Sequence, residues 1–144
     1  MSALKVAEPV FPAPRIDSVP TSDTWESHTA RSVTRWGRAG AVISVNGELD
    51  AANAGQLADY VHHCAVSCQW LVLDLSDLEF IGTAGFSALR DIVARCADTV
   101  TYCTTVPGPA VSRLLRICDP DNALPTTSSV AEALAAVPGL RRVH

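Results

Sequence analysis

The chain has 144 residues, of which 48% are apolar and 18% charged, so it holds enough apolar side chains for one packed domain and is not disordered as a whole. Its net charge of -4 argues against sequence-independent binding of nucleic acid, which needs clustered basic side chains. The five cysteines are an odd number, which argues against a disulfide framework.

Prolines set the first part of the chain apart. Four of them lie among residues 1–29: Pro9, Pro12, Pro14 and Pro20. They interrupt every short apolar run, so this segment is expected to be a flexible leader. The leader lacks the apolar core of a secretory signal, and no later run reaches the roughly 18 apolar residues of a membrane span. We therefore expect a cytoplasmic protein, with a folded domain over residues 30–138 and a tail over residues 139–144.

A predicted hairpin opens the folded domain. Residues 31–36 and 41–45 flank a turn with a glycine at each end, which is typical of two antiparallel strands. Residues 50–64 repeat apolar side chains at helical spacing, and Asp50 is the expected N-cap of that helix. Residues 70–75 are apolar almost without alternation, which predicts a central strand covered on both faces.

The second half of the chain continues to alternate between helix and strand patterns. One helix is predicted from an apolar stripe at helical spacing: Phe86, Leu89, Val93 and Cys96. Residues 99–106 predict a strand, and residues 109–118 predict a helix. A short strand is expected at residues 123–126, and the last helix starts at Ser129, where Glu132 completes a capping box.

This order of elements predicts an α/β fold, a small mixed sheet of four to five strands with about four helices packed on it. The loops that follow the parallel strands share one edge of such a sheet, and binding sites favour that edge. The segments 47–50 and 76–83 are both expected there.

A hydroxyl between two glycines stands out in the second of these segments, LEFIGTAGFS (residues 78–87). No GK[ST] follows it, so it is not a Walker loop, and its glycine spacing fits neither a dinucleotide-binding fingerprint nor a G-x-S-x-G nucleophile turn. A tight strand-to-helix turn is the simplest interpretation, although the N-terminus of a helix can also hold a phosphate. Thr83 is therefore a helix cap, part of a phosphate-binding loop, or a residue that is itself modified.

The remaining polar residues indicate neither a metal site nor a catalytic site. The segment HHCAVSC (residues 62–68) has no second pair of ligands elsewhere, as a tetrahedral zinc site would need. Asp50, Asp74 and Asp77 approach the same sheet edge but suit local turn bonds, and no histidine is expected in the loops of that edge. We expect no cofactor, no metal and no enzymatic activity. A redox pair among the cysteines stays open.

Two segments carry a resemblance to a known family. GELDAANA (residues 47–54) and DLSDLEFIGTAG (residues 74–85) resemble the STAS domain of bacterial anti-sigma factor antagonists. Weaker similarity over residues 109–115 and 129–134 extends the resemblance, in order, across residues 31–137. The resemblance implies the STAS fold, in agreement with the order of elements predicted above.

The same resemblance implies a regulatory binding protein. Members of this family bind an anti-sigma factor that is also a kinase, and so free a sigma factor to join RNA polymerase. The kinase phosphorylates a Ser or Thr before the second helix, and a phosphatase reverses this. Thr83 takes the acceptor position here, and Gly82 stands where the family has an acidic residue. The implied partner-binding residues are Asp50, Gly82, Thr83, Ala84, Gly85 and Phe86, with neither nucleic acid nor membrane as a partner.

A phosphate on Thr83 would add about 1.5 to 2 negative charges at the N-terminus of a helix, where the helix dipole favours an anion. Modification is therefore expected to weaken contact with the partner rather than to unfold the domain. Two alternatives stay open. One is a STAS module that thiol oxidation controls or that binds constitutively, because Gly82 departs from the family pattern. The other is a small nucleotide-binding enzyme that uses the loop from Gly82 to Gly85.

Overall fold

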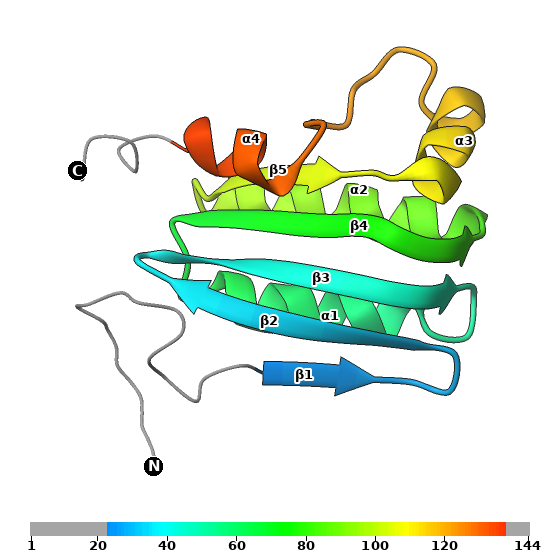
Figure 1. Cartoon of the computed structure of the whole chain (residues 1–144), viewed down its shortest axis with the longest axis horizontal. Helices are drawn as coiled ribbons and strands as arrows, with labels where there is room; N and C mark the ends of the chain where they lie inside the picture. The colour runs from blue at the N-terminus through cyan, green and yellow to red at the C-terminus, as the bar shows by residue number, and fades with distance from the viewer. Residues whose placement is uncertain (1–22, 138–144) are drawn as a thin grey trace.

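The structure, a computed structural model, describes residues 23–137, which form one mixed five-stranded sheet and four helices (Figure 1). The strands lie in the order β1 (Asp23–Glu26), β2 (Ala30–Gly37), β3 (Gly40–Leu49), β4 (Trp70–Ile81) and β5 (Tyr102–Val106). The helices are α1 (Ala54–Ala65), α2 (Thr83–Asp98), α3 (Pro109–Cys118) and α4 (Val130–Ala135). This architecture confirms the predicted small mixed sheet with helices packed on it.

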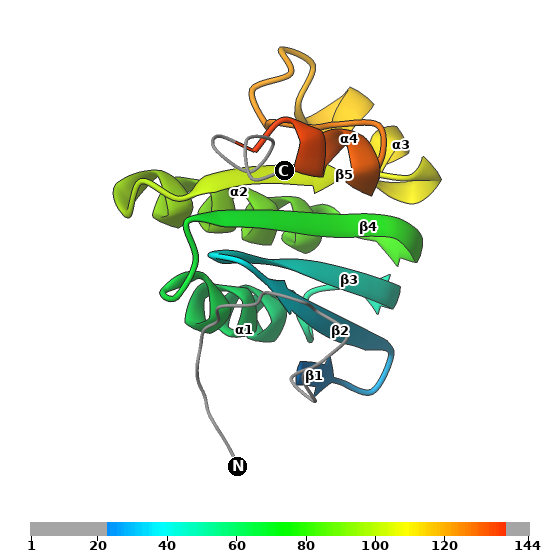
Figure 2. The ribbon, with the colours of Figure 1, turned by 60° about the vertical axis from the view of Figure 1, so that its left-hand side comes forward.

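The strand directions explain why two helices share one face of the sheet. β1, β2 and β3 are antiparallel neighbours, whereas β3, β4 and β5 run parallel. Each parallel step needs a crossover, and α1 and α2 supply both crossovers on the same face (Figure 1, Figure 2). The ends of β3 and β4 therefore meet the starts of α1 and α2 at one edge of the sheet. We call it the carboxyl edge (residues 49–54 and 80–84).

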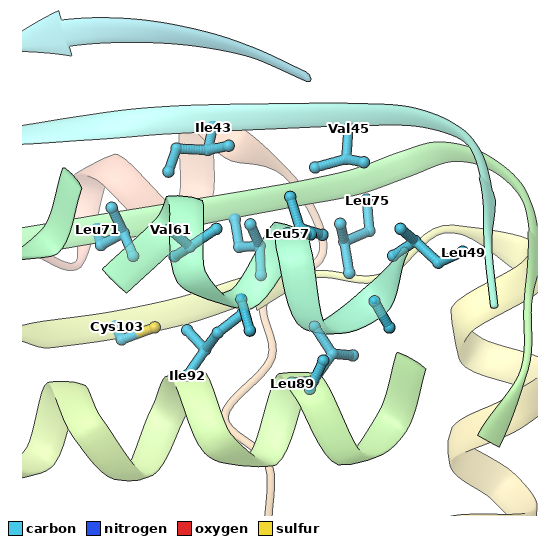
Figure 3. Close-up of a cluster of buried hydrophobic side chains, with 14 of the residues drawn as sticks. Ile43, Val45, Leu49, Leu57, Val61, Leu71, Leu75, Leu89, Ile92 and Cys103 are labelled. Atoms are coloured by element: carbon cyan, nitrogen blue, oxygen red, sulfur yellow. The ribbon is translucent and has the colours of Figure 1, made fainter. Parts of the chain in front are cut away.

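The main core lies between the sheet and the pair α1 and α2 (Figure 3). Its largest fully buried side chains include Ile43, Val45, Leu49, Leu57, Val61, Leu71, Leu73, Leu75, Leu89 and Ile92. Burying one such side chain is worth about 1.5–3 kcal/mol relative to leaving it exposed. This layer fixes α2 against the sheet, and with it the residues at the start of α2. In α2 the buried stripe uses Ile92, while Val93, which the helical spacing predicts, is only half-buried.

A smaller cluster covers part of the opposite face beneath α4. It consists of Val42, Trp70, Val72, Val106, Ala133 and Val137. The indole N–H of Trp70 donates to the Arg38 carbonyl oxygen at 2.7 Å. A Cβ atom at Gly40 would lie 2.1 Å from the Trp70 ring, so only glycine leaves room for the indole at the start of β3.

The folded part begins earlier than the sequence suggests. β1 lies inside the predicted leader of residues 1–29 and pairs antiparallel with β2, and the Trp36 indole N–H donates to the Asp23 carboxylate at 2.9 Å. The four prolines that motivate the leader all precede β1, so they do not interrupt this pairing. Residues 1–22 and 138–144 lie outside the described residues, and with them most of the predicted leader and the tail.

β4 also continues past its predicted end at residue 75. It runs to Ile81 because residues 76–81, several of which are polar, still pair with β3. The register between the two strands shifts between Ser44 and Asn46 and again between Gly47 and Glu48. Of the predicted loop over residues 76–83, only Gly82 lies between β4 and α2. The strand expected at residues 123–126 is reduced to a single bridge between Thr126 and Thr105.

The last helix has the predicted cap, with one different partner. The Ser129 hydroxyl accepts a hydrogen bond from the Glu132 amide at 3.0 Å, as a capping box requires. The Glu132 carboxylate, however, accepts from the amide and hydroxyl of Ser128 rather than from Ser129. These two bonds lower the pKa of the Glu132 carboxyl below its usual value.

Val100, at the end of α2, has a φ of 57°, which lies in the left-handed region that favours glycine. The amides of Thr101 and Val100 donate to the carbonyls of Cys96 and Ala97 at 2.8 and 3.2 Å, the paired bonds of a Schellman helix end. Glycine is the usual residue at this position, and the Val100 side chain is 89% exposed and so gains little from packing.

We therefore expect Val100→Gly to raise the free energy of unfolding by about 1 kcal/mol, because relief of the strain exceeds the added freedom of the unfolded chain. Urea unfolding followed by circular dichroism measures the change. Val66→Gly is the matched control, because Val66 also ends a helix and is exposed but has a φ of -62°. The control is expected to lose stability, and a loss in both variants would show that Val100 is not strained.

Candidate functional site

The carboxyl edge brings together the two sequence segments that carry the predicted site. The register pairs Leu49 of β3 with Ile81 of β4, and the Gly82 amide donates to the Leu49 carbonyl at 3.0 Å. The next residues along each strand, Asp50 and Gly82, are therefore neighbours at this edge. Both are half-exposed.

Thr83 is the first residue of α2, and its side chain is exposed. The residue in the N-cap position is Gly82, with φ -92° and ψ -179°, so Thr83 does not cap the helix as one interpretation of its sequence position had it. A helix start without a capping side chain leaves the Thr83 hydroxyl free of that structural duty. Its position at the surface suits a residue that another protein modifies.

The first turn of α2 offers a favourable place for an anion. The amides of Gly85 and Phe86 donate to the Gly82 carbonyl, at 2.9 and 3.4 Å. The amides of Thr83 and Ala84 precede the first intrahelical bonds, and the first turn carries no acidic side chain. These free N–H groups and the positive end of the helix dipole stabilise a negative charge placed on Thr83.

Two of the six predicted partner-binding residues are buried. A Cβ atom at Gly85 would lie 2.4 Å from Ile81 Cγ1, so this glycine lets α2 start close against the end of β4. Phe86 is 8% exposed and belongs to the buried stripe of α2, with the Arg90 guanidinium 5.7 Å from the centre of its ring. Gly85 and Phe86 therefore shape the edge, whereas Asp50, Gly82, Thr83 and Ala84 present surface.

Phe80, which the sequence does not single out, is the large apolar side chain on this edge. It is 51% exposed, and a Cβ atom at Gly82 would lie 3.7 Å from its Cε2. Exposed aromatic rings are enriched in the core of protein interfaces. No sequence signal predicts its outward direction, because Phe80 forms an apolar pair with Ile81 and the irregular register of β4 shifts the alternation of inward and outward residues.

Asp50 has a different structural role from the one predicted. α1 starts at Ala54, and Asp50 lies in the turn before it, where its Oδ1 accepts from the Ala52 amide at 2.9 Å. Asn53 occupies the N-cap position, but its side chain turns back and makes no cap bond. Asp50 is thus held by a local turn, with its carboxylate at the surface of the edge.

Asn53 is the buried polar residue that holds this edge together, with only 3% of its surface exposed. Its Oδ1 accepts from the Asp50 amide at 2.9 Å, and its Nδ2 donates to Ser27 Oγ, Thr29 Oγ1 and the Glu48 carbonyl at 3.0, 3.1 and 2.9 Å. One side chain thereby ties the β1–β2 turn to the end of β3. Gly47 permits this contact, because its φ is 98° and a Cβ atom would lie 2.2 Å from the Thr29 carbonyl oxygen.

The structure corrects one argument used against catalysis, namely that no histidine lies in the loops of this edge. A histidine does occur at this edge of the sheet, because His28 lies in the β1–β2 turn beside Thr29, whose hydroxyl donates to the Glu48 carbonyl. β3 separates β2 from β4, so two strand spacings, about 10 Å, lie between this turn and the end of β4. The His28 backbone is therefore not a direct neighbour of the residues at the end of β4.

Within residues 23–137, no group of three or more histidine, cysteine or acidic side chains is placed to hold a metal ion. No helix of this region is both long and apolar enough to cross a membrane. Asp74 accepts bonds from the Ser76 amide and hydroxyl at 3.1 and 2.6 Å, the kind of local bond expected of it, although both residues lie within β4 rather than in a turn.

Comparisons with known proteins identify the family to which this fold belongs. The STAS domain family matches residues 30–133. Osmosensory protein A of Mycobacterium tuberculosis (strain ATCC 25618 / H37Rv) is 33% identical to this chain over 97 residues. These residues are 65% of this chain and 61% of that protein, so the match spans less than two thirds of the relative. Anti-sigma-F factor antagonist RsfB of Mycobacterium tuberculosis (strain CDC 1551 / Oshkosh) is 28% identical over 102 residues, 70% of this chain and 84% of that protein.

Among solved structures, an anti-sigma factor antagonist from Mycobacterium paratuberculosis superposes with a TM-score of 0.68 and 27% sequence identity, covering 76% of this chain and 94% of that one. The sheet order and the helix positions described above are thus those of a known anti-sigma factor antagonist. From the family match over residues 30–133 and this shared fold, the chain belongs to the STAS domain family.

Proposed function

We propose that this chain is an anti-sigma factor antagonist, which binds an anti-sigma factor through the carboxyl edge and so releases a sigma factor for transcription. The relatives with that name and the shared fold support the general role. The observation that carries the proposal is the exposed Thr83 hydroxyl at the first position of α2, between the half-exposed Gly82 and Ala84 and close to the exposed Phe80.

Phosphorylation of Thr83 by a kinase-type anti-sigma factor is the proposed switch. A small hydroxyl lets a partner approach the backbone of Gly82 and Ala84 closely, whereas a hydrated dianion holds the partner away. The free first-turn amides stabilise the added charge, so the domain stays folded while the contact is lost. A phosphatase would restore binding, and both reactions are proposed to take place in the cytoplasm.

Intact-mass spectrometry after incubation with the cognate anti-sigma kinase and ATP tests the proposed acceptor. The parent chain is expected to gain one phosphate, and Thr83→Ala is expected to gain none. Ser87→Ala is the matched control, because Ser87 is an exposed hydroxyl one turn further along α2. Equal phosphorylation of the parent and Thr83→Ala would remove Thr83 from the proposal, and loss of the phosphate only in Ser87→Ala would move the acceptor to Ser87.

Gly82 can accept the acidic side chain that the family pattern has at this position. Its backbone is extended, and the nearest atoms to an added Cβ are at 3.7 to 4.0 Å, which is ordinary contact. An aspartate here would accept hydrogen bonds from the free amides of the first turn. The Gly82→Asp variant is expected to be more stable than the Gly82→Ala variant, with a free energy of unfolding about 1 kcal/mol higher. Urea unfolding measures this difference. Equal stability of the two variants would show that the side chain at residue 82 does not cap α2.

A further inference from the structure

Four buried cysteines gather at the end of the main core opposite the carboxyl edge. They are Cys64, Cys68, Cys96 and Cys103, all of them free thiols. Cys64 lies near the end of α1 and Cys96 near the end of α2, while Cys68 immediately precedes β4 and Cys103 lies near the start of β5. The proposed function uses none of these residues.

Two of these thiols form a direct pair. The side chains of Cys96 and Cys103 hydrogen-bond each other between α2 and β5. The Schellman turn holds their backbones together, because the Thr101 amide donates to the Cys96 carbonyl at 2.8 Å just before β5 begins. Figure 3 shows the Cys103 side chain in the layer between β5 and α2, in the same core region as Ile92. A disulfide needs Cα atoms about 4.4–6.8 Å apart, and the short turn between α2 and β5 keeps the two backbones close to each other.

The other two thiols of the group lack such a partner. Cys68 Sγ donates to the Cys64 carbonyl oxygen at 3.4 Å rather than to a sulfur atom. Burial raises the pKa of the Cys64 thiol to about 11 and that of Cys68 to about 12, so both remain protonated at neutral pH.

The two members of the pair differ in acidity. The hydrogen bond from Cys103 lowers the pKa of Cys96, because it stabilises the Cys96 thiolate. The same bond, together with burial, raises the pKa of Cys103. Because the thiolate is the reactive form of cysteine, Cys96 is the residue of the pair that an oxidant attacks.

We propose that Cys96 and Cys103 form an oxidation site, at which a hydroperoxide converts the two contacting thiols into a disulfide that ties α2 to β5. The Cys96 thiolate attacks one oxygen of the peroxide, breaks the O–O bond and becomes a sulfenic acid while hydroxide, or the alkoxide of an organic peroxide, leaves. The Cys103 sulfur then attacks the Cys96 sulfur, and the sulfenic oxygen leaves as water with the two remaining protons. With hydrogen peroxide, two thiols and one peroxide give one disulfide and two waters.

The oxidant reaches the pair through the end of α2. Cys96 and Cys103 are 2% and 9% exposed, so a local opening must precede the reaction. The last turn of α2 is suited to open, because the neighbouring Val100 is strained and its side chain packs on little.

Trypsin separates the candidate pair from the other cysteines. Cleavage after arginines places Cys96 and Cys103 together in the peptide of residues 96–113, Cys64 and Cys68 in residues 39–90, and Cys118 in residues 117–141. After treatment of the full chain with hydrogen peroxide and alkylation of the remaining thiols in denaturant, the peptide 96–113 is expected to lose two hydrogens and to carry no label. The peptide 39–90 is expected to carry two labels.

Variants sharpen this test. In Cys103→Ala the disulfide cannot form and Cys96 loses the bond that stabilises its thiolate, so the peptide 96–113 is expected to carry one label on Cys96. Cys68→Ala, which removes an equally buried thiol, is expected to form the disulfide as the parent does. Full labelling of the peptide 96–113 after peroxide, or loss of two hydrogens from the peptide 39–90 first, would overturn the proposal. The test needs no partner protein, so its result is independent of the proposed role of Thr83.

Discussion

Replacing Thr83 by glutamate is expected to weaken binding of the anti-sigma factor by about 100-fold, which is ~2.7 kcal/mol. Thr83 lies between the small, half-exposed residues Gly82 and Ala84, so the partner can approach the backbone closely only while residue 83 stays small and uncharged. The partner would also cover the introduced carboxylate, which would lose its hydration without gaining an opposite charge. Titration calorimetry with the purified anti-sigma factor, in the absence of ATP, measures the difference.

Ser87→Glu separates the position of the charge from its presence. Ser87 is exposed on α2 one turn beyond Thr83, so the variant adds the same charge to the same helix. It is expected to change affinity only a few-fold, as charges at the rim of an interface do. Unchanged affinity of Thr83→Glu would contradict the proposed switch and favour a STAS module that binds constitutively. Circular dichroism is expected to show the native fold in both variants.

Asn53→Ala is expected to have the largest effect on stability among the residues of the carboxyl edge, a loss of about 2–3 kcal/mol. The substitution leaves the part-buried Asp50 amide without its partner and removes the bonds from Asn53 Nδ2 to Ser27, Thr29 and the Glu48 carbonyl, which weakens the tie between the β1–β2 turn and β3. It is also expected to weaken partner binding, because the turn that carries Asp50 loses its support. Urea unfolding gives the first quantity, and calorimetry with the anti-sigma factor gives the second.

Asp50→Ala is the control for Asn53, because it removes the turn bond to the Ala52 amide, which is exposed to solvent. Its cost is expected to stay below ~1 kcal/mol. Equal losses in the two variants would mean that Asn53 does not organise the edge. A large loss of affinity without loss of stability in Asp50→Ala would instead identify its carboxylate as a partner contact.

Much of the fold follows from the spacing of apolar residues. Helical spacing locates α2 and α3 closely, because each helix must bury a stripe against the rest of the domain. β1 is not predictable in this way, since its residues are mostly exposed and its stabilisation comes from pairing with β2 and from the contact between Trp36 and Asp23. The extension of β4 is missed for a similar reason, because polar residues normally mark a loop.

The location of the candidate site was predictable, but the direction of its side chains was not. Parallel strands joined by helices place Asp50 and Thr83 at one edge, and the register of Leu49 with Ile81 agrees with that expectation. The irregular register shifts the alternation of inward and outward residues, so Phe80 is exposed while Ile81 is buried. The bonds of Asn53 join three separate segments, and no local pattern in the sequence indicates them.

Binding before and after phosphorylation tests the central claim most directly. The parent chain and Thr83→Ala are each mixed with the cognate anti-sigma kinase, and the complex is followed by size-exclusion chromatography before and after ATP and Mg²⁺ are added. Both chains are expected to bind at first, and only the parent is expected to dissociate as it gains one phosphate. Dissociation of both chains, or persistence of both complexes after the parent is phosphorylated, would contradict control through Thr83.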